Sequence, residues 1–173
     1  SYVFAANHQG AFDIFLIYGF LGAPVKWVMK AGIGKIPFVG AACKAAGFIF
    51  VDNSSPKAAA RSVLEAERIL HKGASIAIFP EGARSETGKL ARFKKGAFQM
   101  AADQHLQVVP ITLNGPFHVL PIGSLNLHRH PMEMVIHAPI TLPDEGVGMP
   151  KGLQSIADET KRIISEDLWE EFK

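Results

Sequence analysis

The stretch Ala74-Ser75-Ile76-Ala77-Ile78-Phe79 is apolar at nearly every position and runs directly into Pro80-Glu81-Gly82. An apolar run that does not alternate with polar residues is typical of a strand buried on both faces, as strands of parallel sheets are. Residues 108–113 repeat the pattern after a helix expected over residues 96–105. Strands that alternate with helices predict a parallel or mixed sheet with helices packed over it.

The helix before this strand carries the clearest signals in the chain. Ser55 is a good N-cap, Pro56 suits the first helical position, and Gly73 provides a stop. Residues 52–55 predict the turn that precedes it. Apolar residues repeat at helical spacing along it: Ala59, Val63, Ala66 and Leu70.

The remaining segments complete one α/β domain. Residues 11–21 are apolar nearly all round, which predicts a buried helix, and the glycines of residues 30–40 predict a loop. Further strands are expected over residues 2–6, 25–29, 48–51 and 132–137. A closing amphipathic helix is expected from an apolar stripe: Leu153, Ile156, Ala157, Thr160, Ile163, Ile164 and Leu168. We therefore predict a single domain over residues 1–173, with a mixed, mostly parallel sheet covered by helices.

Composition narrows the function. With 48% hydrophobic and 20% charged residues, 173 residues are enough for one ordinary globular core. The net charge of +2 is far from the basic stripe of a nucleic-acid binder but compatible with anionic ligands or a membrane surface. Cys43 is the single cysteine, which excludes an intramolecular disulfide and thiolate-rich zinc sites, so a reducing, cytoplasm-facing location is expected.

No stretch predicts a transmembrane helix, because residues 14–25 are too short and the later uncharged run is interrupted by prolines. The chain opens directly on an expected core strand, without a start methionine or a signal-peptide pattern. We expect it to be part of a longer protein.

The segment Asn7-His8-Gln9-Gly10-Ala11-Phe12-Asp13 pairs a histidine with a carboxylate, which is sufficient to remove a proton from a hydroxyl near neutral pH. Five positions on a continuous helix are about 140° apart, so His8 must precede the helix if Asp13 is to reach it. We expect that helix to begin near Gln9 or Gly10. The alternative is a capping histidine beside a surface aspartate, but Asp13 lies within an apolar run, where a carboxylate needs a partner.

The segment Phe79-Pro80-Glu81-Gly82-Ala83-Arg84-Ser85 predicts an anion site. Gly82 lets a ligand approach the backbone, and Arg84 can donate two hydrogen bonds to a phosphate. Glu81 would orient the arginine or a substrate hydroxyl. The alternative is an ordinary turn with solvated charges. The downstream cations suit an anionic headgroup or equally a solvated face: Lys89, Arg92, Lys94 and Lys95.

The sequence argues against three other functions. A serine hydrolase is disfavoured because no Gly-x-Ser-x-Gly segment is present. A metal site at His128, His130 and His137 is disfavoured because Pro131 predicts a loop there. A noncatalytic lipid-binding module is the alternative from another class, and the paired His8 and Asp13 argue against it.

Four blocks in order resemble the glycerophospholipid acyltransferases, typified by bacterial lysophosphatidic acid acyltransferase. They are Asn7-His8 with Asp13, Lys30 followed by Ile36-Pro37-Phe38 and Gly40, Phe79 to Ser85, and Val109-Pro110-Ile111. The resemblance spans Val3 to about Pro139. The family commonly has serine at the position of Gly10 and threonine at that of Ala83.

The resemblance implies an acyl transfer from acyl carrier protein or coenzyme A to the free hydroxyl of lysophosphatidic acid, with no metal and no further cofactor. His8 would be the general base and Asp13 its orienting partner. Glu81, Gly82 and Arg84 would bind the acceptor phosphate, with Lys30 as a further candidate. It also implies attachment to the cytoplasmic face of the cell membrane, peripherally or through an N-terminal segment outside this chain.

Overall fold

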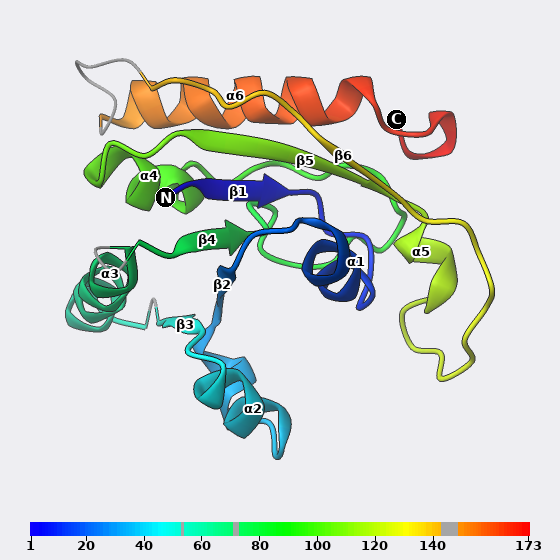
Figure 1. Ribbon diagram of the computed structural model, residues 1–173, viewed down its shortest axis with the longest axis horizontal. Helices are drawn as coiled ribbons and strands as arrows, with labels where there is room; N and C mark the ends of the chain where they lie inside the picture. The colour runs from blue at the N-terminus through cyan, green and yellow to red at the C-terminus, as the bar shows by residue number, and fades with distance from the viewer. Residues whose placement is uncertain (53, 71–72, 143–148) are drawn as a thin grey trace.

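The computed structural model describes residues 1–52, 54–70, 73–142 and 149–173. Within them, one six-stranded sheet has the order β3-β2-β4-β1-β5-β6 (Figure 1). Neighbouring strands are parallel except β5 and β6, which are antiparallel, so the predicted mixed, mostly parallel sheet is confirmed. The strands are β1 Val3–Ala6, β2 Val25–Lys30, β3 Ile49–Val51, β4 Ser75–Ile78, β5 Val108–Asn114 and β6 Glu133–Ile136.

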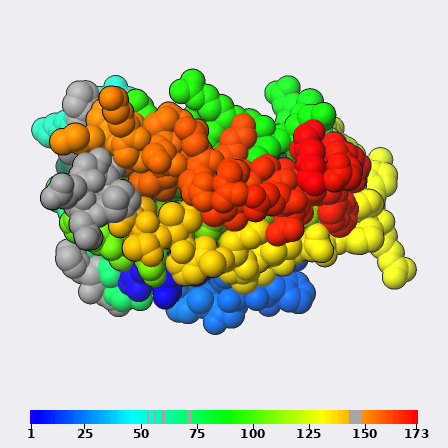
Figure 2. Space-filling model, turned by 90° about the horizontal axis from the view of Figure 1, so that it is seen from above, coloured from blue at the N-terminus to red at the C-terminus, as the bar shows by residue number. Residues whose placement is uncertain are grey.

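Helices cover both faces of the sheet. Val3 and Ala5 of β1 pack into a core shared with α3, α4 and α6, whereas Phe4 and Ala6 face α1. Figure 2 shows α6 extending across the face seen from above. The α-helices are α1 Asp13–Phe20, α2 Val39–Ala45, α3 Pro56–Leu70, α4 Gln99–Asp103, α5 Pro116–Val119 and α6 Pro150–Glu166, and the 3-10 helices are η1 Ala31–Lys35, η2 Lys95–Phe98 and η3 Glu170–Phe172.

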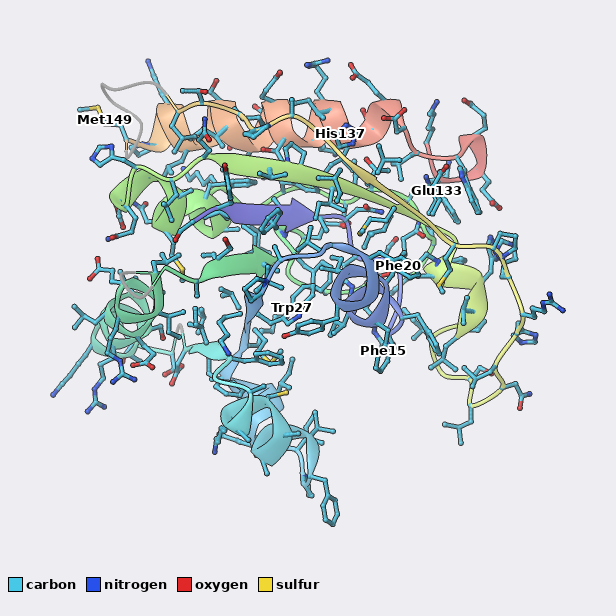
Figure 3. The ribbon with its side chains drawn as sticks, viewed as in Figure 1. Phe15, Phe20, Trp27, Glu133, His137 and Met149 are labelled. Atoms are coloured by element: carbon cyan, nitrogen blue, oxygen red, sulfur yellow. The ribbon has the colours of Figure 1, made fainter. Side chains whose placement is uncertain are left out.

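The prediction of a helix buried all round over residues 11–21 is wrong in two respects. The helix α1 begins at Asp13, later than Gln9 or Gly10, because the carboxylate of Asp13 caps the turn before it. It is also covered on one side alone, since Leu16 and Ile17 are buried while Phe15 and Phe20 are exposed. Figure 3 shows Phe15 pointing away from the sheet.

The segment predicted as a loop over residues 30–40 instead forms η1 and the start of α2. A Cβ atom on Gly40 would lie 2.3 Å from the carbonyl oxygen of Gly34, so glycine is what lets the two turns pack. Glycine therefore permits close packing here instead of marking irregular structure. Phe38 precedes α2 with a φ of 61° and is 92% exposed.

The other helices follow the sequence with smaller differences. Ser55 caps α3 as predicted, through a hydrogen bond from the Ala58 amide. Asn53 of the expected turn, and residues 71 and 72 near the expected helix end, lie outside the described residues. The helix expected over residues 96–105 is divided into η2 and α4, and α5 was not predicted.

The closing helix α6 packs along β5 and is followed by a turn that reaches back to the sheet. Asn114 at the end of β5 accepts a hydrogen bond from the Trp169 amide, and the Trp169 indole donates to Glu133. His137, just after β6, lies beside α6 and is hydrogen bonded to Thr112 (Figure 3). Among the described residues, no helix is both long and apolar enough to cross a membrane.

Asn7 extends the pairing of β1 with β5 beyond the last strand residue. Its side-chain amide donates to the Leu113 carbonyl at 2.9 Å, and its side-chain oxygen accepts from the Leu113 amide at 2.8 Å. The asparagine is buried, and its side-chain amide makes the pair of hydrogen bonds that a strand backbone would make. It therefore fixes the backbone immediately before His8.

We expect Asn7→Ala to lower the free energy of unfolding by roughly 2–5 kcal/mol, because it leaves two buried backbone groups of Leu113 without partners. Urea denaturation measures the change, with Asn126→Ala in an exposed loop as the control. A loss equal to that of the control would show that Asn7 is not a structural bridge.

Candidate active site

Residues 7–13 and residues 79–85 meet at the carboxyl edge of the sheet. β1 and β4 are parallel neighbours with Ala5 opposite Ile78, so His8 and Glu81 follow the ends of adjacent strands. Ligands of open α/β sheets bind at this edge. Glu81 contacts His8 directly, because its carboxylate accepts a hydrogen bond from the His8 amide.

His8 and Asp13 form a hydrogen-bonded pair. The Nδ1 atom of His8 lies 2.7 Å from Oδ2 of Asp13, and the aspartate is fully buried. A carboxylate at Nδ1 holds the ring proton on that nitrogen, which leaves the lone pair of Nε2 for a substrate proton. The histidine side chain keeps 17% of its surface exposed, enough for access.

Asp13 is held by its position as the first residue of α1. Its Oδ2 also accepts hydrogen bonds from the amides of Gln9 and Gly10, at 2.7 and 3.0 Å. A carboxylate at a helix N-terminus is stabilised by the helix dipole and by free amides. Burial nevertheless raises the pKa of Asp13, and the hydrogen bond from His8 and its charge are the main opposing effects.

Phe79 supports the imidazole from one side. The two rings are parallel within 6° with centroids 3.9 Å apart. Trp27 of β2 stacks on the other side of Phe79 at 4.8 Å, and Figure 3 shows this tryptophan in the interior. The ring plane of His8 is therefore fixed by packing, and its in-plane direction by Asp13.

Glu81 braces the site instead of facing a ligand. One carboxylate oxygen accepts from the His8 amide at 2.8 Å, and the other accepts from the Ala91 amide at 2.7 Å. Burial raises its pKa, against the lowering effect of these two hydrogen bonds. Residues 79–88, which follow β4 and include the predicted anion site, are called the anion loop. With both oxygens occupied, Glu81 joins the backbone of His8 to the segment that follows this loop.

Further hydrogen bonds and one aromatic contact hold the anion loop. The Ser85 amide donates to the His8 carbonyl at 2.8 Å, and the Ser85 hydroxyl donates to the Lys89 carbonyl at 2.7 Å. This geometry assigns Ser85 a structural hydroxyl and gives no support to a serine nucleophile. Phe172 of η3 lies against Gly88, where an added Cβ would come within 2.6 Å of its ring.

The residues predicted to bind phosphate lie at one edge. Gly82 has a φ of 77°, which favours glycine, but its amide donates to the Phe79 carbonyl and is not free for a ligand. Arg84 is exposed in the same loop. Lys30 ends β2, which neighbours β4, so it reaches the same edge without a hydrogen bond or ion pair to the loop among the described residues.

Gly10 departs from the family's usual serine for a visible reason. A Cβ atom there would lie 2.7 Å from the carbonyl oxygen of Pro116, at the start of α5.

Within the described residues, no group of three or more histidine, cysteine, aspartate or glutamate side chains is arranged to hold a metal ion. His130, one of the histidines weighed above, lies 4.5 Å from His118 between ring centroids.

Comparison with known proteins gives the family. A family model described as Acyltransferase matches residues 1–114. The chain belongs to this acyltransferase family.

The sequence predicts the pairing of His8 with Asp13 in this acyltransferase chain, but it does not reveal that Phe79 supports the His8 ring or that Glu81 braces the site. The position of Phe79 directly before the Pro-Glu-Gly turn was the available signal.

The relatives agree in name. The chain is 39% identical over 139 residues to the chloroplastic 1-acyl-sn-glycerol-3-phosphate acyltransferase LPAT1 of Arabidopsis thaliana, covering 80% of this chain and 39% of that protein. It is 28% identical to the Pseudomonas aeruginosa 1-acyl-sn-glycerol-3-phosphate acyltransferase, covering 97% and 64%. The crystal structure of the LPA acyltransferase PlsC from Thermotoga maritima matches with a TM-score of 0.76 and 29% identity, covering 96% and 66%. The chain spans about half the length of several curated relatives.

We expect Phe79→Leu to lower kcat for acyl transfer, the reaction type of this family, roughly two- to tenfold, because it removes an aromatic contact of about 0.5–1.5 kcal/mol that orients His8. The acceptor KM should stay within twofold. Steady-state kinetics measures both, with Phe15→Leu on the exposed side of α1 as the control. An unchanged kcat would contradict the role of this ring.

We expect Glu81 to make stability depend on pH. Because its pKa in the folded chain lies above the ordinary 4.5, the folded state binds this proton more tightly than the unfolded state. The free energy of unfolding, measured relative to Glu81→Gln, should therefore fall as pH rises from 4.5 through the raised pKa. Urea denaturation at a series of pH values tests this, with Glu86→Gln as the matched control. If the free energy of unfolding relative to Glu81→Gln instead rises with pH, the expectation is contradicted.

Proposed function

We propose that this chain catalyses transfer of a fatty acyl group from a thioester to the free hydroxyl of lysophosphatidic acid, giving phosphatidic acid. The observation that supports it best is the 2.7 Å pair of His8 and Asp13, joined through Glu81 to a loop that carries Arg84. The names of the relatives support the same acceptor and reaction.

The proposed mechanism uses His8 as the general base. Its Nε2 accepts the proton of the acceptor hydroxyl as the oxygen attacks the thioester carbonyl. The tetrahedral intermediate then expels the thiolate, which takes the proton back from the imidazolium. Asp13 stabilises the imidazolium between the two steps, and no acyl group is attached to the enzyme.

The acceptor phosphate is proposed to bind at the loop after β4. Arg84 offers a planar, always charged donor pair, and Lys30 approaches from β2 at the same edge. The backbone amides of Ala83 and Arg84 have no hydrogen-bond partner among the described residues, which makes them further donors. Gly82 provides the turn and Glu81 holds it in place.

The donor is proposed to be the thioester of acyl carrier protein or coenzyme A, and the acceptor is proposed to be taken from the cytoplasmic face of the cell membrane. Exposed aromatic side chains are compatible with that location, among them Phe15 and Phe20 of α1 and Phe38 just before α2. Scattered surface apolar residues are ordinary, but exposed aromatic rings on a helix suit a membrane interface.

The decisive experiment measures acyl transfer from both thioesters to lysophosphatidic acid in detergent micelles. We expect His8→Ala to lower kcat at least a hundredfold, because general base catalysis contributes roughly 10²- to 10⁴-fold. Arg84→Ala should raise the acceptor KM at least tenfold because a charge-assisted hydrogen bond is lost. Arg129→Ala, at an exposed position before β6, is the matched control.

A native chain that binds lysophosphatidic acid but transfers no acyl group, with binding unchanged in His8→Ala, would overturn the proposal. That outcome would favour the noncatalytic lipid-binding module. Transfer to a different lysolipid in preference to lysophosphatidic acid would instead correct the acceptor and keep the mechanism.

A further inference from the structure

Lys94 lies across the anion loop. A Cβ atom added to Gly82 would be 2.7 Å from the Lys94 Nζ atom and 3.2 Å from its Cε atom. The Lys94 amide donates to the Pro80 carbonyl at 2.9 Å, which fixes the lysine backbone beside the same turn. Lys94 follows Gly82 by twelve positions in the sequence, yet its ammonium group lies over this glycine of the Pro-Glu-Gly turn.

The ammonium of Lys94 is available to an anion. Among the described residues Lys94 forms no ion pair. The carboxylate of Glu81 belongs to the same turn, but amides of His8 and Ala91 already occupy its oxygens. The ammonium of Lys94 therefore keeps its three N–H donors for a ligand.

Gly82 and the end of the Lys94 side chain lie close together. The φ of 77° at Gly82 already disfavours a side chain, and the Lys94 side chain occupies the space that a Cβ would need. A residue other than glycine would push the ammonium away from the turn. Lys94 is exposed, and its ammonium lies close to Gly82.

We propose that Lys94 is a phosphate-binding residue, whose ammonium pairs with the acceptor phosphate together with Arg84 and so directs the acceptor hydroxyl toward His8. The inference rests on the proposed function for the identity of this anion. Two cations, one on the loop after β4 and one on the segment that follows it, match a phosphate dianion better than a monoanionic or neutral headgroup. Lys94 thereby contributes to the choice of a phosphorylated acceptor.

Binding of glycerol 3-phosphate, the soluble headgroup of the acceptor, tests the inference without requiring acyl transfer. We expect Lys94→Met to weaken binding, followed by NMR titration, about tenfold or more, because a charged hydrogen bond is lost. Lys95→Met removes the same charge from the neighbouring residue and should stay within twofold of the native chain. Lys94→Arg should retain most of the affinity.

Kinetics give a second readout. Lys94→Met should raise the KM for lysophosphatidic acid at least tenfold while kcat changes less than threefold, and it should leave acylation of monoacylglycerol unaffected. Equal binding by Lys94→Met and Lys95→Met would overturn the inference even if acyl transfer is confirmed. A native chain that fails to transfer acyl groups, yet loses glycerol 3-phosphate binding in Lys94→Met, would overturn the proposed reaction and support the phosphate site.

Discussion

The buried carboxylate of Glu81 is the interaction on which the rest of the site depends. It joins the backbone just after β1 to the segment beyond the loop that follows β4, through amides of His8 and Ala91. Removing a carboxylate from water is costly, and two amide hydrogen bonds offset part of that cost. The backbone of His8, proposed as the general base, and the loop proposed to bind the phosphate are consequently joined through one carboxylate.

The sheet makes this connection achievable. Parallel neighbours place the ends of β1 and β4 side by side, and Asn7 continues the β1 pairing by one residue through its side chain. Asp13 then begins α1, and the amides of Gln9 and Gly10 in the turn before this helix support its charge. Most hydrogen bonds to the carboxylates of Asp13 and Glu81 come from backbone amides, which offset part of the cost of burying these groups.

Much of this could be predicted from the sequence. Unalternating apolar runs identified the parallel strands, and five-residue spacing placed His8 before the helix that contains Asp13. The stacking of Phe79 on His8 and the engagement of Glu81 could not be predicted, because both require knowing that β1 and β4 are adjacent. The helix α2 does not follow from the sequence, because glycines such as Gly40 ordinarily indicate a loop, whereas here Gly40 permits the close approach of Gly34.

The contact of Phe172 with Gly88 bears on where this domain can be divided. The family model ends at residue 114, yet the anion loop is supported by an aromatic ring from η3, and the end of β5 is tied to Trp169. A chimaera joined near residue 114 would combine a loop from one parent with a support from the other. Successful recombination between relatives of this family therefore requires the two segments to be exchanged together.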